Sequence, residues 1–377
     1  MNIEWYWFGF AMIALIAVLA YFDVHISARI LGITLLCEIV TLLVFDVVIF
    51  TSASGNVSAS AINPVNAFKG LPAGKFGGGA LAAGAAGIGI FFAFWSWVGW
   101  EMAPNYGEES TNPKRNVPRA LYISVIGLGI FYTLTSWAGI SGYRSINAAA
   151  SVAQNNSANF YFLPAQHYGG LLLKDCLSWF IITGSFACGM AFHNTTARYM
   201  YALGREGVMP RPLGRTHTRH RSPHVASTTQ SVIAALILAA FALFAAVNAK
   251  LGAGDSVGYL QVYGLMAVMG VVSILAIQAL VSLAIFNYFR THHKADHHWW
   301  TTITAPLISF VSQAIVLYLA IKNLNFLGSG YSYAKWLCWG DLAIFVGGLG
   351  YAFYLKSNNR AKYETIGRMI NQGLDQV

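Results

Sequence analysis

Two acidic side chains, Glu38 and Glu101, stand within long apolar stretches of the chain and are the residues best placed to do chemistry. Burying a carboxylate among apolar groups is costly, so acidic residues in such positions are rare and by default functional. We therefore predict that both are functional and that Glu38 titrates during transport. The alternatives are a cap on a helix end for Glu101 and a neutral hydrogen bond to neighbouring helices for Glu38. Asp46 and Asp341 lie nearer the ends of their stretches, and we expect them to reach the polar interface.

Glu101 belongs to a segment whose composition predicts an interrupted helix. Gly99 permits an unwound backbone, and Pro104 suits the first turn of a helix that restarts after a break. Unpaired backbone groups are costly in hydrocarbon, so a break persists only where it lines a cavity or meets a solute. Free N–H groups at the restart favour a carboxylate, and carbonyls before the break favour an ammonium group. The predicted binding residues are Trp95, Trp97, Val98, Gly99, Trp100 and Glu101.

Clustered histidines predict an alternative chemistry, because such clusters bind metals and histidine boxes mark membrane di-iron enzymes. Two loops contain them: His217, His220, His224, His292, His293, His297 and His298. Their spacing is irregular and does not follow a helical period. We therefore expect no metal, no cofactor and no catalytic residue, and keep a histidine-box membrane metal-dependent oxygenase as the alternative function.

The composition places these residues in a lipid bilayer, since 56% of the 377 residues are hydrophobic and 10% are charged. The apolar segments lack the alternating polarity of a membrane barrel, so we predict an all-α membrane protein. Nine stretches are long enough to span: 5–21, 27–50, 83–103, 119–141, 176–202, 226–248, 257–289, 302–322 and 334–355.

Basic residues orient the predicted spans. Fifteen Lys and Arg lie in one set of loops and the C-terminal tail, against seven in the other set, so the first set marks the cytoplasm. The net charge of +9 also favours anionic lipid headgroups. No basic run comes with the fold signals of a nucleic-acid-binding protein, so nucleic acid is excluded as a partner. From placement on this face, we predict a gate in which Glu108, Glu109 and Arg115 pair with basic residues that include Arg205.

The odd number of predicted spans has a consequence for the N-terminus. With the C-terminus in the cytoplasm, Met1 would lie outside, yet MNIEWYW contains no basic, cleavable secretion signal. A chain that begins in this way is typical of the later part of a longer protein. We therefore expect further helices upstream of Met1.

Three segments carry a resemblance to a known family. Residues 94–120 contain Gly99, Trp100 and Glu101 and continue with two glutamates, Asn112, Pro113 and the run Pro-Arg-Ala. Residues 197–210 read ARYMYALGREGVMP, and residues 24–38 read VHISARILGITLLCE. In that order, they resemble the sixth helix with its following loop, the end of the eighth helix and the start of the fifth helix of the amino acid/polyamine/organocation permease superfamily.

This resemblance implies a fold of two inverted five-helix repeats, in which the first and sixth helices unwind at mid-membrane and hold the substrate. The nine predicted spans would be helices four to twelve of a twelve-helix plan, with the broken helix at about 91–110. Residues 1–357 would form the transmembrane permease domain, and residues 358–377 a cytoplasmic tail. The first three helices of the plan would be absent.

The resemblance also implies roles for single residues. In related arginine/agmatine exchangers, a tryptophan at the position matching Trp95 closes over the substrate as a lid, and we expect a gating role for Trp95. An interfacial belt of tryptophans is the alternative. The family's glutamate at the Glu101 position is linked to proton-dependent release. Some proton-coupled relatives have a lysine near the Glu38 position, so this chain departs from that pattern.

We thus expect a secondary active transporter of the cell membrane that moves an amino acid or related amine by alternating access, coupled to protons as a symporter or exchanger. A transport-inactive permease fragment is a further alternative. The expected partners are the small-molecule substrate, protons and membrane lipids.

Overall fold

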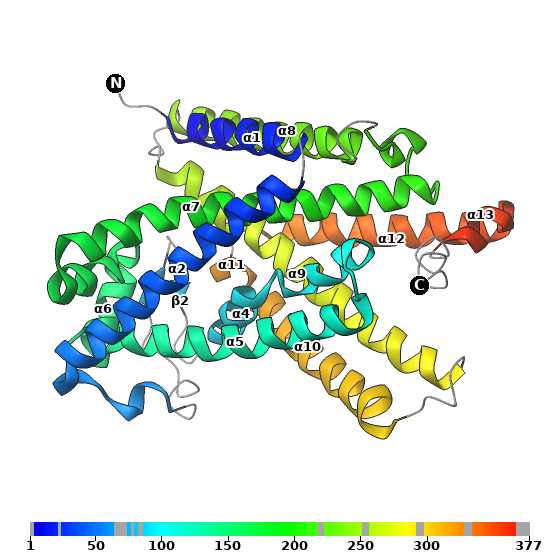
Figure 1. Ribbon diagram of the computed structural model, residues 1–377. Coiled ribbons are helices and arrows are strands. Elements are labelled where there is room, and N and C mark those ends of the chain that lie inside the picture. The colour runs from blue at the N-terminus through cyan, green and yellow to red at the C-terminus, as the bar shows by residue number, and fades with distance from the viewer. Residues whose placement is uncertain are drawn as a thin grey trace. The chain divides into compact units, whose positions relative to one another are not determined.

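The computed structural model describes residues 4–21, 24–63, 74–76, 79–81, 86–217, 222–250, 256–291, 298–327 and 334–366. Helices make up nearly all of this described part (Figure 1). The exception is an antiparallel pair of short strands, β1 (Gly74–Phe76) and β2 (Gly79–Leu81), in which Lys75 pairs with Ala80. The protein is therefore an all-α membrane protein, as the composition predicts.

The chain divides into two compact units, which are described separately below. The first unit contains Met1–Ile62, Gly99–Asp255 and Leu349–Val377. The second contains Asn63–Val98 and Ser256–Gly348. The boundary between Val98 and Gly99 falls within the predicted binding segment, so that segment is continuous along the chain but contributes to both units.

The first unit is built on long apolar helices. Its helices are α1 (Trp5–Tyr21), α2 (Val24–Ser52), η1 (Ser54–Asn56), η2 (Ala59–Ala61), η3 (Trp100–Glu109), α5 (Pro113–Ser141), α6 (Ile146–Asn155), η4 (Ser157–Asn159), α7 (Phe162–Arg205), η5 (Arg211–Gly214), α8 (His224–Lys250) and α13 (Arg360–Thr365). Helix α1 packs beside α8, and α2 packs against α5 and α7 (Figure 1). Phe45 and Ile49 of α2 are fully buried in the core between these helices, together with Ala138 and Ala165.

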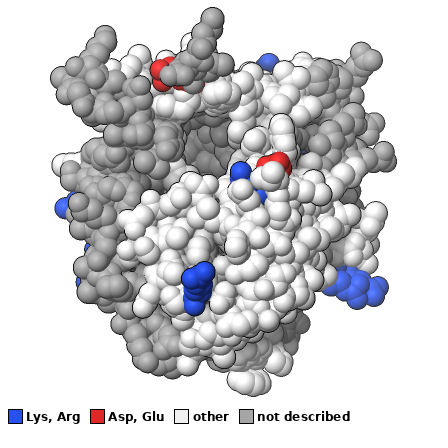
Figure 2. All heavy atoms as spheres, turned by 90° about the vertical axis from the view of Figure 1, so that its left-hand side faces the viewer, with Lys and Arg blue, Asp and Glu red and all other residues white. Residues whose placement is uncertain are grey.

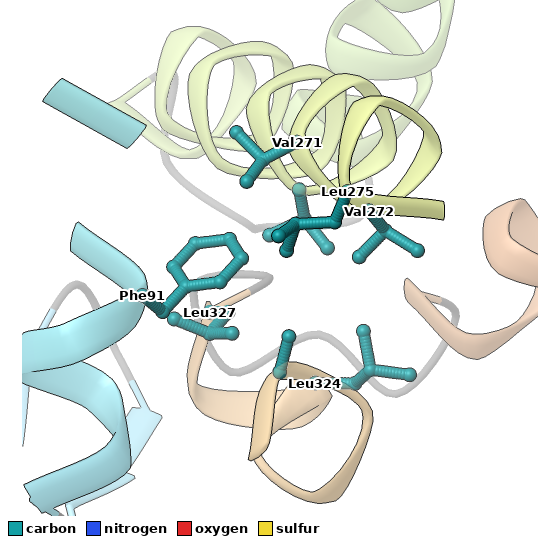
Figure 3. Packing of buried hydrophobic residues seen from close by; sticks show 8 residues of the cluster. Phe91, Val271, Val272, Leu275, Leu324 and Leu327 are labelled. Atoms are coloured by element: carbon teal, nitrogen blue, oxygen red, sulfur yellow. The ribbon is translucent and has the colours of Figure 1, made fainter. Parts of the chain in front are cut away.

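The second unit has its own hydrophobic core. Its helices are α4 (Ala86–Trp97), α9 (Ser256–Thr291), the π-helix η7 (Trp299–Thr304), α10 (Ala305–Lys322) and α11 (Leu324–Leu327), and α12 (Ala334–Asn358) contributes its first part. Phe91 of α4 points toward Val271 and Leu275 of α9, with Leu324 and Leu327 of α11 on the other side (Figure 3). This packing fixes α4, which leads into the predicted break.

Within the described part, seven helices are long and apolar enough to cross a membrane. They correspond to seven of the nine predicted stretches. The other two stretches form α1, which has 17 residues, and α4, which has 12 residues because the chain leaves the α-helical conformation after Trp97. The count of nine spans and the inverted repeat remain predictions.

The outer surface suits lipid. Large apolar side chains are exposed on the spanning helices, for example Ile123 at 72%, Leu172 at 78% and Ile344 at 72%. The face in Figure 2 shows few charged side chains among its described atoms. Apolar surface on this scale is costly in water and stable in a bilayer, so the chain is a multi-pass membrane protein.

Candidate functional site

The predicted helix break lies at Gly99. Helix α4 ends at Trp97, Gly99 has φ 119° in the left-handed region, and the 3-10 helix η3 begins at Trp100. A residue with a Cβ atom rarely adopts that φ, so glycine is the residue that lets the chain change helix type here. The interruption expected from the composition is confirmed.

Glu101 folds back onto this break. Its Oε2 atom accepts a hydrogen bond from the Gly99 backbone N–H at 2.9 Å, and its side chain is half-buried. The capping alternative for Glu101 is therefore present in the structure. The free N–H groups expected at the restart are, at Gly99, already occupied by a carboxylate of the protein itself.

The predicted place of Pro104 is wrong. Pro104 is the fifth residue of η3 and not part of its first turn, because helical structure resumes directly at Trp100. Proline has no N–H, so it cannot donate the i→i−3 bond to the carbonyl of Glu101 that a 3-10 helix would otherwise form there. The Glu101 carbonyl therefore lacks this one intrahelical donor close to the break.

Trp95 lies in an aromatic cluster of the second unit. Its ring stacks on Phe92 with centroids 5.7 Å apart, meets Tyr263 of α9 at 5.5 Å and meets Phe91 edge-on at 6.2 Å. Tyr263 is 65% exposed. Three aromatic rings thus contact Trp95, and its side chain is half-buried. This environment is compatible both with a lid over the substrate and with an interfacial tryptophan, so the gating role stays a prediction.

The remaining predicted binding residues lie on both sides of the break. Val98 packs against the core around Phe91, and its N–H donates to the Trp95 carbonyl at 3.0 Å. Trp97 ends α4 and Trp100 starts η3, both half-buried. The predicted binding residues are therefore consecutive in the chain, with Val98 on the α4 side of the break and Trp100 on the η3 side.

Glu38 reaches across to another helix of the first unit. The hydroxyl of Thr183 on α7 donates to Glu38 Oε1 at 3.3 Å. A Cβ atom placed on Gly184 would lie 3.0 Å from Oε1 and 3.1 Å from Oε2. Glycine at position 184 therefore leaves the space that the half-buried carboxylate occupies. The hydrogen-bonding alternative for Glu38 is present in the structure.

Asp46 is a buried acidic residue whose burial the sequence did not reveal. Its side chain is 5% exposed, so the expectation that it reaches the interface is wrong. Packing of α2 against α5 covers it, and Thr135 donates to Oδ2 at 3.0 Å. Its Oδ1 atom has no hydrogen-bond partner among the described residues. A signal was available, since Asp46 follows Glu38 by eight residues on the same helix.

The predicted gate is described only on its basic side. The side chains of Glu108 and Glu109 are outside the described part. Arg115 is exposed, and the Arg205 guanidinium lies 5.5 Å from the ring centroid of Tyr201. The gate therefore stays a prediction.

A cation–π contact that the sequence did not indicate connects η3 to α7. The Arg198 guanidinium lies 4.3 Å from the ring centroid of Tyr106. Arg198 stands within a membrane-spanning helix, where an aromatic face partly replaces the water that the cation loses. The contact positions η3, and with it Glu101, against the longest helix of the first unit.

The histidines do not assemble a metal centre in the part that can be described. Within it, no three His, Cys, Asp or Glu residues stand close enough to hold a metal ion. His217 and His224 meet edge-on at 5.2 Å beside Tyr21, and His298 caps η7 by accepting from the Trp300 N–H. The other histidines of the two loops lie outside the described residues: His220, His292, His293 and His297.

Comparison with known proteins also indicates an amino acid permease. The family model described as "Amino acid permease" matches residues 2–343. The uncharacterized amino acid permease YecA of Bacillus subtilis is 29% identical over 184 residues, which cover 48% of this chain and 41% of YecA. The branched-chain amino acid permease BcaP of Bacillus subtilis is 25% identical over 61% of this chain and 44% of BcaP. Human b(0,+)-type amino acid transporter 1 is 26% identical over 44% of this chain. The matches span less than half the length of these relatives, at 41%, 44% and 32%.

Proposed function

Because this chain belongs to the amino acid permease family, we propose that it carries an amino acid or a related amine across the cell membrane as a secondary active transporter. The family consists of transporters and not of enzymes, and related proteins are named as amino acid permeases. The proposed transport is coupled to protons and proceeds by alternating access around the break at Gly99, with nine spans and a cytoplasmic C-terminus.

One observation carries this proposal, namely the hydrogen bond from the Gly99 N–H to the Glu101 carboxylate at 2.9 Å. The carboxylate of an amino acid seeks the same kind of N–H group at a helix restart. Two carboxylates sharing one donor repel each other, and protonating Glu101 removes that repulsion and weakens its hold on the N–H. Substrate binding at Gly99 would therefore be accompanied by proton uptake on Glu101.

The other residues of the segment surround this point in the proposal. The substrate ammonium group would lie near the carbonyls at the end of α4, where the helix dipole is negative. Trp97, Val98 and Trp100 would form the wall, and the tryptophan faces suit a cation. Trp95 would close over the substrate. The latch of Glu108, Glu109 and Arg115 with Arg205 would hold one state of the cycle.

Glu38 would act as a second proton site in this proposal. Its carboxylate sits between α2 and α7 against Thr183 and Gly184, so a change in its charge acts directly on the packing of the two helices. Packed helices switch between two discrete arrangements and do not deform continuously. Alternating access requires two such arrangements.

Changing Gly184 to Ala tests this role of Glu38. The new methyl group would stand 3.0 Å from Oε1 and displace the carboxylate, so we expect uptake to fall about three- to tenfold, as for a buried steric clash costing roughly 1 kcal/mol. Initial uptake rates in proteoliposomes at several pH values measure it. Gly32→Ala, on α2 with open space around its Cβ position, is the matched control. Equal rates for both variants would remove Glu38 from the mechanism.

The proposed function itself is tested by uptake into proteoliposomes that contain the purified protein. Labelled amino acids and amines are supplied with an inward proton gradient, and we expect at least one of them to accumulate above its external concentration. A protonophore should abolish that accumulation. Uptake that ignores the gradient would contradict proton coupling, and no uptake or binding of any amino acid or amine would contradict transport.

A further inference from the structure

A large cavity lies within the second unit, and none of its lining residues belongs to the segment around Gly99. Its volume is about 1090 Å³, and residues of α9, α10, α11 and α12 line it. Ligand pockets usually measure roughly 300–1,000 Å³, so this cavity accommodates a large molecule. Most of its lining is apolar, for example Ala276 and Leu280 of α9, Phe310 and Ala314 of α10, and Phe345 of α12.

The charged groups of the cavity are unevenly placed along its length. Lys322 is the last residue of α10 and Lys335 the second residue of α12; both are exposed and both line the cavity. Phe310 stands twelve positions before Lys322, which at a rise of about 1.5 Å per residue is roughly 18 Å along the helix. Phe345 stands ten positions after Lys335, roughly 15 Å along α12. One end is therefore basic and the far end apolar.

The length of the cavity matches the length of one lipid molecule of the bilayer. Half of the hydrocarbon core of about 30 Å is the depth that one lipid tail occupies, and the cavity extends over a similar length. Trp336 and Trp339, next to Lys335 on α12, are 73% and 61% exposed, and tryptophans of this kind lie at the level of lipid headgroups. The basic end of the cavity is thus expected at the headgroup level of one leaflet.

We propose that this cavity binds an acidic phospholipid, with its phosphate between Lys322 and Lys335 and an acyl chain along the apolar walls of α9, α10 and α12. Basic pockets between membrane-spanning helices recognise acidic headgroups in this manner. The site is specific for an amphiphile because both the charge and the apolar depth are required.

Among the described residues, Asp341 is the one acidic residue in the lining, and a negative charge there opposes the binding of an acidic ligand. It lies six residues after Lys335, within hydrogen-bonding reach of Ser273 of α9. Its Oδ2 atom is buried without a hydrogen-bond partner among the described residues. It therefore stands beside the tail and not beside the phosphate, so its charge should matter little for an acidic lipid and greatly for a cationic amphiphile.

The occupant would also contact the core that supports Trp95. Four lining residues belong to the hydrophobic cluster around Phe91, against which Trp95 packs: Val272, Leu317, Leu324 and Cys338. Filling the cavity adds contacts to one side of this cluster while Trp95 contacts it from another. A bound lipid should therefore stabilise the second unit against heat.

Native mass spectrometry of the purified protein tests the site, with phosphatidylglycerol and phosphatidylcholine of identical acyl chains as probes. We expect the acidic lipid to bind about tenfold or more tightly than phosphatidylcholine and to raise the unfolding temperature further. The double change Lys322→Gln and Lys335→Gln should remove that preference, because each lysine near a lipid phosphate raises the affinity roughly fivefold. The double change Lys114→Gln and Lys356→Gln, at exposed sites outside the cavity, is the matched control.

Two further variants separate the possible ligands. Ala314→Trp fills the apolar part and should weaken both lipids, whereas Asp341→Asn removes a negative charge from the lining and should not weaken the binding of the acidic lipid. Loss of lipid binding in Asp341→Asn with no effect of the lysine changes would overturn the proposal in favour of a cationic amphiphile. Equal binding of both lipids by the unaltered protein, or displacement by inorganic phosphate alone, would overturn it as well.

Discussion

Replacing Glu101 with Gln is expected to abolish proton-driven accumulation of substrate while leaving exchange across the membrane intact. Glutamine keeps an oxygen that can accept from the Gly99 N–H, but it is neutral at every pH and resembles the protonated glutamate. The variant should therefore bind substrate with an affinity that does not change with pH. In the unaltered protein, affinity should fall as the pH rises, by at most about tenfold for each pH unit, as linkage to one proton requires.

The measurement is uptake into proteoliposomes with and without an inward proton gradient, together with exchange of internal unlabelled for external labelled substrate. Asp175→Asn, which removes an exposed carboxylate from α7, is the matched control and should behave like the unaltered protein. Accumulation by the Glu101→Gln variant at the normal level would show that the coupling proton binds elsewhere, with Glu38 as the next residue to change.

Replacing Gly99 with Leu is expected to reduce uptake about ten- to hundredfold. At φ 119° a leucine is strained, and strain of roughly 1–3 kcal/mol at one residue is enough to move the chain into another conformation. The N–H at residue 99 would then turn away from both Glu101 and the substrate. Initial uptake rates, normalised to protein in the membrane, measure the loss.

Gly127→Leu is the matched control for that change. Gly127 lies in α5 with open space around its Cβ position and without a positive φ, so leucine there should be accepted by the lipid-facing surface. If the Gly99→Leu variant retains normal uptake, the break has no part in binding. If both variants lose uptake equally, the loss reflects impaired membrane insertion and not a change at the helix break.

The membrane setting and the helix break could be predicted because they depend on local composition. Apolar length alone identifies the helices, and a glycine within the Trp-rich segment identifies a place where the helix stops. The position of Pro104 within η3 could not be predicted in the same way. It depends on which residue resumes helical structure, and that register is set by contacts of η3 with α5 and α7, such as Arg198 over Tyr106.

The partners of the acidic residues could not be predicted either. The sequence identifies Glu38 and Asp46 as acidic residues in one apolar helix, but not which of them is buried. Asp46 is the more buried of the two because α5 covers it, and Glu38 is half-buried because Gly184 of α7 leaves room for it. Such pairings join residues more than 80 positions apart, for example Asp46 with Thr135, and sequence spacing within one helix does not reveal them.

Proton uptake on substrate binding tests the central claim most directly. Isothermal titration calorimetry of the purified protein with its substrate, in buffers of different ionisation enthalpy, counts the protons taken up for each substrate bound. We predict that the unaltered protein takes up protons, at most one for each substrate bound, and that Glu101→Gln takes up none. Binding heats that do not depend on the buffer, or the same proton count in both proteins, would contradict competition between the substrate carboxylate and Glu101 for the Gly99 N–H.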